Sequence, residues 1–191
     1  MLNWLFHTPP PASTPRTAIG LVSGTSLDGL DACVVKETGH SNRVEVVSTL
    51  STVFPPLVRD GLKRMIETGH TNIHELLNLE HQYTEAVAQQ CQQLIKATDE
   101  SISVIGFHGQ TLWHAPDLGS TLQIGFAEYL AETTGIPVAH QFRRSDMARG
   151  GQGAPLAPLF HQLHFERETE NVAVLNLGGI ANISLLVPGQ P

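Results

Sequence analysis

The chain has 191 residues, of which 41% are hydrophobic and 15% are charged, and its formal net charge is −7 at pH 7. This apolar content excludes a disordered chain, and the acidic balance argues against a nucleic-acid binder, which normally needs a basic face. No apolar run approaches the roughly 20 residues of a membrane-spanning helix, and the length suits one domain or one domain plus part of another.

The amino terminus and the cysteines indicate a compartment. Residues 1–16 are predicted to form a disordered leader, because prolines at 9–11 end a short apolar run that is too brief for a secretory signal. Cys33 and Cys91 lie inside apolar patterns and have no paired spacing. They are typical of reduced core residues, so we expect a cytoplasmic protein.

Apolar patterns predict the elements in chain order. Branched residues indicate strands at 18–23, 30–36 and 43–50, the first two forming a hairpin around residues 24–29. Pro55 opens a short helix, and an apolar stripe predicts a long helix over 73–97 with Asn72 as its N-cap and Glu75 as the capping-box partner. The remaining expectations are a strand at 102–107, a polar loop, a helix near 125–134, a strand at 137–140, a Gly-rich loop at 150–153 and a helix over 155–165.

Two apolar strands, 171–177 and 181–187, end the chain and are joined through Gly178 and Gly179. The preceding alternation of strands and helices favours a mixed sheet covered by helices. Strands with nearly continuous apolar sequence usually need partners on both faces. Because the sequence supplies no further element to cover this last hairpin, we expect a second lobe to follow.

The segment from Ser23 to Asp31, SGTSLDGLD, is the first that could carry chemistry. Its glycines let the backbone approach an anion, and its amides and hydroxyls could hold phosphate oxygens. Asp28 or Asp31 could hold a metal-bound water or position an attacking group. The alternative is an ordinary hairpin built from turn-favouring residues.

Two further polar segments follow strands. The first is GFHGQT at 106–111, at a strand's carboxyl end, where open α/β sheets bind ligands. The second is FRRSD at 142–146 followed by GGQGAP at 150–155, where Arg143 or Arg144 could clamp a carboxylate and Pro155 would begin an anion-binding helix. The alternatives are a loop histidine bonded to backbone and a solvated loop with a structural salt bridge. His161 and His164 share a helix face without a third ligand, which disfavours zinc.

Together, four strings resemble the anhydro-N-acetylmuramic acid kinase family over residues 17–187: GLVSGTSLDGLD, GFHGQT, FRRSDMARGGQGAPL and LNLGGIANISLL. The resemblance implies the sugar kinase/heat-shock protein 70/actin fold class, with two lobes and ATP in the cleft between them. The expected fold is therefore α/β: a ribonuclease-H-like mixed sheet flanked by helices, plus the first hairpin of a second lobe.

The resemblance also implies an activity, the ATP-dependent phosphorylation of 1,6-anhydro-N-acetylmuramic acid with hydrolytic opening of its anhydro ring. The product, N-acetylmuramic acid 6-phosphate, belongs to peptidoglycan turnover. The implied cofactors are ATP and Mg²⁺, with Asp28 and Asp31 as the metal residues, and the implied sugar-binding residues are His108, Gln110, Arg143 and Asp146. The implied ATP-binding residues are Gly24, Thr25, Ser26, Leu27, Asp28, Gly29, Leu30, Asp31, Gly178 and Gly179.

The resemblance divides the chain into a leader at 1–16, a first lobe at 17–168 and the start of a truncated second lobe at 169–191. The family's aspartate base lies in a Gly-Phe-Asp-x-Gly-Pro segment that would follow the last residue, so no catalytic residue is predicted in the chain itself. We therefore expect little or no kinase activity from this chain alone. A noncatalytic nucleotide- or sugar-binding module is the alternative. The expected partners are the sugar and ATP, without nucleic acid or membrane, and a homodimer stays open for the full-length family enzyme.

Overall fold

The computed structural model describes residues 16–37, 44–177 and 181–190, so the predicted leader up to residue 15 lies outside the described residues. A five-stranded sheet is built from β1 (Thr17–Ser23), β2 (Leu30–Glu37), β3 (Val44–Thr52), β4 (Ile102–Phe107) and β7 (Val138–His140). Its strand order is β3-β2-β1-β4-β7. The first three strands are antiparallel neighbours, whereas β4 runs parallel to both β1 and β7. The expected ribonuclease-H-like mixed sheet is confirmed.

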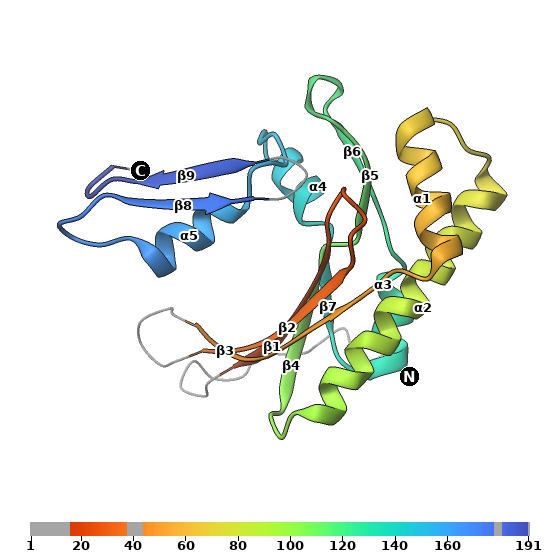
Figure 1. Cartoon of the computed structure of the whole chain (residues 1–191), viewed down its shortest axis with the longest axis horizontal. Coiled ribbons are helices and arrows are strands. Elements are labelled where there is room, and N and C mark those ends of the chain that lie inside the picture. Colours follow the sequence, from red (N-terminus) through yellow and green to blue (C-terminus); the bar gives the residue numbers. More distant parts are fainter. Residues whose placement is uncertain (1–15, 38–43, 178–180, 191) are drawn as a thin grey trace.

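Three helices cover one face of this sheet: α1 (Pro56–Thr68), α2 (Ile73–Ala97) and α3 (Ala127–Thr134). Figure 1 shows them together on one side, and α2 contacts β1, β2 and β3. The long helix begins and ends where the apolar stripe predicts. Its N-cap is also confirmed, because Asn72 Oδ1 accepts a hydrogen bond from the Glu75 amide at 2.9 Å. Ile19, Val34, Leu62, Cys91, Ile105 and Leu130 are fully buried between the layers.

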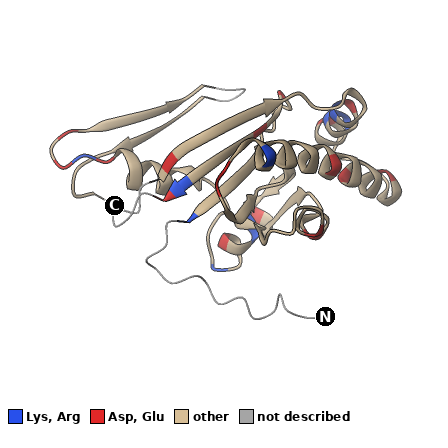
Figure 2. Cartoon of the chain, turned by 90° about the horizontal axis from the view of Figure 1, so that it is seen from below, with Lys and Arg blue, Asp and Glu red and all other residues tan. Residues whose placement is uncertain are grey.

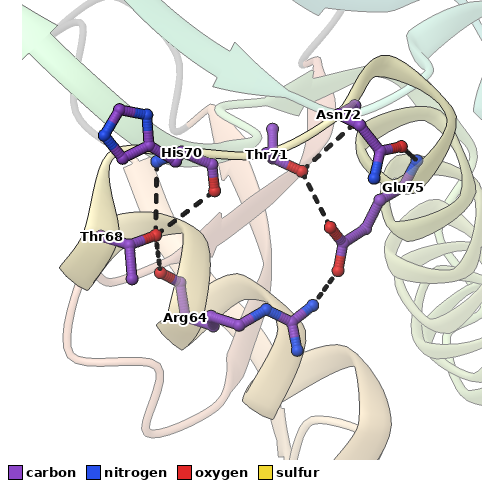
Figure 3. Close-up of polar contacts among 6 residues, drawn as sticks. All are labelled: Arg64, Thr68, His70, Thr71, Asn72 and Glu75. Atoms are coloured by element: carbon purple, nitrogen blue, oxygen red, sulfur yellow. Dashed lines mark hydrogen bonds and ion pairs between the residues drawn. The ribbon is translucent and has the colours of Figure 1, made fainter.

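The corner between α1 and α2 is held by side chains from both helices (Figure 3). The Glu75 carboxylate accepts a hydrogen bond from Thr71 Oγ1 at 3.2 Å and pairs with Arg64 on α1. Thr68 Oγ1 donates to the Arg64 carbonyl oxygen at 2.7 Å, and Gly69 takes the left-handed conformation that ends α1. Glu75 therefore joins the two helices, and its carboxylate forms these contacts in place of the expected capping-box return.

Residues 110–124 contain a hairpin where the sequence pattern predicts a polar loop. Its strands are β5 (Gln110–Ala115) and β6 (Ser120–Ile124), joined by the 3-10 turn η3 (Pro116–Leu118). A register shift lies between Thr111 and Trp113, so Thr111 and Leu112 are both buried in succession. This irregularity removes the alternation by which a strand is recognised in a sequence.

Two helices depart from the expected boundaries. Helix α4 (Phe142–Met147) was not expected; it begins after Gln141, whose φ is +63°. Helix α5 (Ala157–Phe165) begins two residues later than predicted. Pro158, rather than Pro155, stands in its first turn.

The last two strands, β8 (Val172–Asn176) and β9 (Asn182–Leu186), pair as a separate antiparallel sheet. The predicted hairpin is thus confirmed, although Gly178 and Gly179 lie outside the described residues. Leu186 is buried, whereas an apolar row faces outward at Leu175, Leu177, Ile183 and Leu185. Figure 1 shows this hairpin with α5 on the side of the main sheet opposite α1 and α2.

Helix α5 touches both sheets through its two histidines. His161 Nδ1 lies 2.9 Å from Ser184 Oγ on β9, and His164 Nε2 accepts a hydrogen bond from the Val44 amide on β3 at 3.1 Å. Each ring is therefore engaged with a different sheet. The same helix links the hairpin to the edge of the main sheet.

Along the ribbon in Figure 2, Lys and Arg positions lie among Asp and Glu positions in the part of the chain that the structure describes. Among the described residues, no helix is long and apolar enough to cross a membrane. Both Cys33 and Cys91 are free thiols, and Cys91 is completely buried.

Candidate functional site

Three polar segments meet at one edge of the main sheet. Strands β1, β4 and β7 are parallel, so their carboxyl ends lie on the same side. The segments that follow them are the turn after Ser23, the loop at His108 and Gly109, and helix α4 after Gln141. The His108 amide donates to the Leu21 carbonyl oxygen at 3.1 Å, which ties the loop at His108 to β1. Such an edge is where open α/β sheets place ligands.

The first turn presents its polar side chains outward because Leu27 points inward. Leu27 adopts a φ of +57°, its amide donates to the Gly24 carbonyl oxygen at 3.1 Å, and its side chain is buried. Thr25, Ser26 and Asp28 are exposed. The apolar anchor thus fixes a short arch whose hydroxyls and carboxylate are available to a ligand.

Tyr83 on α2 supports the strand ends beneath this turn. Its ring stacks between Phe54 and Phe107, with centroids 6.2 Å from each, and its hydroxyl lies 3.0 Å from Ser23 Oγ. Burial raises the pKa of Tyr83 above its ordinary value, so the phenol stays protonated. The arch and the end of β4 therefore share one buried support.

A cleft of about 720 Å³ separates the first turn from α1. Arg59 and Lys63 line it from the helix and face Thr25 and Ser26. The motif analysis missed these two cations, although their spacing of four residues places them on one helix face. Each has an acidic neighbour, Asp60 at 3.0 Å from Arg59 and Glu67 at 3.8 Å from Lys63.

The two predicted metal residues have different surroundings. Asp28 lines the cleft beside α1. Asp31 lies on β2 between the buried Leu30 and Ala32, so its side chain faces the other side of the sheet, where Ser51 Oγ donates to its Oδ1 at 2.6 Å. Both carboxylates are exposed and offer the oxygen ligands that Mg²⁺ prefers.

Three of the four predicted sugar-binding residues belong to one hydrogen-bonded group. Arg143 Nε donates to His108 Nε2 at 2.9 Å, and Arg143 Nη1 donates to the Gly153 carbonyl oxygen at 2.7 Å. The Gly153 amide in turn donates to Asp146 Oδ2 at 2.7 Å. Both backbone polar groups of Gly153 are thus held by side chains of α4, which fixes the loop at 150–153 against that helix.

Burial sets the protonation of this group. It lowers the pKa of His108 below the ordinary value; the Gly109 hydrogen bond raises that pKa less, and the nearby Arg143 charge lowers it further. Burial also lowers the pKa of Arg143 from its very high ordinary value. The result is a neutral imidazole against a half-buried guanidinium.

Gln110, the fourth predicted sugar-binding residue, is separated from this group. Its side chain is completely buried, and its Nε2 donates to the Thr111 carbonyl oxygen at 3.0 Å. Its Oε1 is buried and has no hydrogen-bond partner among the described residues. Gln110 is therefore buried at the start of β5 and makes no hydrogen bond to the Arg143 group among the described residues.

The sequence named Arg144 as a candidate carboxylate clamp and 150–153 as a Gly-rich loop, but it did not predict that these residues hold α4 and its loop in place. Arg144 Nε donates to the Thr121 carbonyl oxygen on β6 at 3.2 Å, which fastens α4 to the hairpin. Gly151 packs against the Asp146 carboxylate so closely that a Cβ would overlap it. The glycine-rich composition of 150–153 signals close backbone packing, but the role of Gly153 lies in its main-chain atoms and leaves no side-chain signal.

The fold and this edge define an α/β domain that gathers a turn rich in glycine and hydroxyl groups and a hydrogen-bonded arginine at parallel strand ends. A sequence model described as anhydro-N-acetylmuramic acid kinase matches residues 16–191. The chain belongs to the anhydro-N-acetylmuramic acid kinase family.

Similar proteins agree on the family. The chain is 41% identical over 181 residues to the anhydro-N-acetylmuramic acid kinase of Bordetella avium, covering 94% of this chain and 48% of that protein. With the Bordetella petrii kinase it shares 43% identity over 186 residues, covering 95% and 49%. The chain thus spans about half the length of these curated relatives. A solved Aquifex aeolicus PPX-GPPA enzyme is similar with a TM-score of 0.44 and 9% identity, covering 92% of this chain and 54% of that one.

Proposed function

We propose that this chain is the amino-terminal part of a kinase that acts on 1,6-anhydro-N-acetylmuramic acid. The observation that carries the proposal is the family match across residues 16–191. The grouping of His108, Arg143 and Asp146 at the strand ends adds a site of the right chemistry. In the cell this enzyme would act in the cytoplasm, which supplies ATP and keeps thiols such as Cys33 and Cys91 reduced.

The reaction consumes one water and one ATP. Water adds to the anomeric carbon C1 of the sugar, the bond between C1 and O6 breaks, and O6 forms the new bond to the γ-phosphorus as ADP leaves. The proton lost by the water passes to a carboxylate base. The family pattern assigns that base to an aspartate that is not among the residues of this chain, so the half of the relatives' length that the chain does not cover would supply it.

The chain's own residues would bind and orient both substrates. Arg143, half-buried and fixed by two hydrogen bonds, would attract the carboxylate of the sugar's lactyl group. The arch at 24–29 would offer amides and the hydroxyls of Thr25 and Ser26 to the phosphates of ATP. When bound, Mg²⁺ would neutralise charge on the phosphates of ATP. Asp28, which lines the cleft, could hold it there, whereas Asp31 faces the other side of the sheet.

A second lobe would complete the cleft. The first lobe would comprise 17–168 and residues 169–191 would begin the second, with Gly178 and Gly179 among the proposed ATP-binding residues. The outward apolar row of Leu175, Leu177, Ile183 and Leu185 is the surface that further strands would cover. Phosphoryl transfer needs nucleophile, phosphates and metal positioned together, so the isolated chain should show little turnover.

Complementation tests this proposal. The purified chain is mixed with ATP, Mg²⁺ and 1,6-anhydro-N-acetylmuramic acid, with and without the carboxyl-terminal half of the Bordetella petrii kinase. We expect little sugar phosphate from the chain alone and measurable product when the second half is added. The matched control carries Arg143→Ala, which should reduce the restored rate.

Two outcomes would overturn it. Turnover by the chain alone at roughly 1–100 per second, the range of ordinary kinases, would refute the need for a second lobe. Binding of ATP or sugar by the chain, with no product after complementation, would favour the alternative of a noncatalytic binding module.

A further inference from the structure

We propose that His108 is a positioning residue, which holds the guanidinium of Arg143 in place through an unprotonated Nε2. The inference rests on the proposed function, because Arg143 is there the partner of the sugar carboxylate. It assigns His108 a role behind the arginine rather than a proton-transfer role or a direct contact with the sugar. The geometry that carries it is the 2.9 Å contact between Arg143 Nε and His108 Nε2.

The contacts of the ring define its tautomer. Arg143 Nε can only donate a hydrogen bond, so His108 Nε2 must accept and carries no hydrogen. His108 Nδ1 lies 2.8 Å from the Gly109 carbonyl oxygen, which can only accept, so Nδ1 carries the hydrogen. Both ring nitrogens are therefore committed to protein partners, and neither remains to exchange a proton with a substrate.

The guanidinium is fixed at two of its three nitrogens. Nε is held by His108 and Nη1 by the Gly153 carbonyl oxygen, while Asp146 holds the amide of the same glycine. Nη2 has no acceptor among the residues that the structure describes. Arginine often binds a carboxylate through two parallel hydrogen bonds, for example from Nε and Nη2. His108 already occupies Nε here, so a carboxylate that approaches Arg143 would bond to Nη2.

Protonation of His108 would place a hydrogen on Nε2 and turn the acceptor toward Arg143 into a second donor. The imidazolium would then repel the guanidinium it orients. Other charged or titratable side chains belong to the elements around this pair and enter the same balance: Arg144 and Asp146 on α4, His114 on β5 and His140 on β7. The arrangement is stable with a neutral ring, in agreement with the direction in which burial moves the pKa of His108.

Nuclear magnetic resonance of the ¹⁵N-labelled chain tests the positioning role without any ligand. We expect His108 to show a protonated Nδ1 and a bare Nε2 at neutral pH, and the Nε–H of Arg143 to give a sharp, slowly exchanging signal. His108→Gln, whose amide oxygen can accept from Arg143, should keep that signal, and His108→Phe should lose it. His70→Gln, in the α1–α2 corner, is the matched control and should leave it unchanged.

A proton on Nε2 at neutral pH would overturn the inference, and so would a persistent Arg143 signal in the folded His108→Phe variant. If that variant does not fold, the tautomer in the wild-type chain and the behaviour of His108→Gln still decide the question. If His108 only stabilised the fold, its replacement would change the free energy of unfolding. The Nε–H signal of Arg143 would then not depend on whether residue 108 can accept a hydrogen bond.

Sugar binding separates the inference from the proposed function. Titration with 1,6-anhydro-N-acetylmuramic acid, and with 1,6-anhydro-N-acetylglucosamine, which lacks the lactyl carboxylate, should show that the wild-type chain prefers the first. His108→Phe should weaken binding of the carboxylated sugar about tenfold and leave the second sugar unchanged, whereas His108→Gln should restore the preference. If the wild-type chain bound both sugars equally well, the carboxylate role of Arg143 would be refuted. The tautomer of His108 and the Nε–H signal of Arg143 would still test the positioning role of His108.

Discussion

Ser23 and Tyr83 hold hydroxyl groups 3.0 Å apart in the core, although 60 residues separate them in the chain. Ser23 ends β1 immediately before the exposed arch, and Tyr83 packs against Phe107 at the end of β4. The same buried tyrosine therefore contacts the last residue before the proposed phosphate turn and the strand end before the proposed sugar site. The two surface segments thus share one buried support.

Tyr83→Phe should weaken this support. The ring stays and keeps its stacking, but the buried Ser23 hydroxyl loses its partner, which should lower the free energy of unfolding by about 1–2 kcal/mol. Urea unfolding measures the change, with Tyr129→Phe on α3 as the matched control. Equal stability of Tyr83→Phe and the wild type would show that the hydroxyl contact contributes nothing.

Gln90 on α2 makes a second buried polar contact with the sheet. Its Nε2 donates to the Leu30 carbonyl oxygen at 2.6 Å and to the Leu50 carbonyl oxygen at 2.9 Å. Gln90→Leu keeps a similar volume but removes the donor from both carbonyls, so we expect a loss of about 1–3 kcal/mol by urea unfolding. Gln93→Leu, on the exposed side of the same helix, should stay within about 0.5 kcal/mol of wild type.

Gly151→Ala should release the loop at 150–153. The new methyl group would overlap the Asp146 carboxylate, which must then move away from the Gly153 amide. Because a hydrogen bond to a charged group is lost, the free energy of unfolding should fall by about 1.5–3 kcal/mol. The sharp Nε–H signal of Arg143 should also be lost. Gln152→Ala changes the exposed neighbour and should alter neither. A Gly151→Ala variant with the wild-type free energy of unfolding and an unchanged Arg143 Nε–H signal would contradict the packing of Asp146 on Gly151.

Stability should depend on pH through His108. Burial lowers its pKa in the folded chain below the ordinary 6.5, so protons bind the unfolded chain more readily. The contribution of the neutral ring is complete above about pH 6.5 and is lost as the pH falls through the folded-state pKa. His108→Gln should therefore lose less stability than the wild type on acidification, as measured by urea unfolding at a series of pH values. Identical slopes for His108→Gln and the wild type would refute this assignment.

The sequence predicted the elements whose signals are local and repeated. Helix α2 has a cap at Asn72 and an apolar stripe along its length, and its boundaries follow the pattern. The β5–β6 hairpin was missed because the shift between Thr111 and Trp113 breaks the alternation, and α4 was missed because six residues are too few to show a helical period.

The candidate site divides in the same way. Motifs pointed to His108, Arg143 and Asp146, and the structure brings them together. Gly153, which joins Arg143 to Asp146, acts through its main-chain amide and carbonyl, and these leave no side-chain signal in a sequence. Arg59 and Lys63 were missed because they approach the first turn only after α1 has packed beside it.

The two edges of the main sheet differ in length, since β7 has three residues and β3 has nine. An added strand needs several successive backbone groups to pair with, so only β3 is long enough to act as a template for another chain. His164 takes up the amide of Val44 at the first residue of that strand. Helix α5 thus occupies a backbone donor at the start of this longer edge, and His164→Ala would leave the Val44 amide without that acceptor.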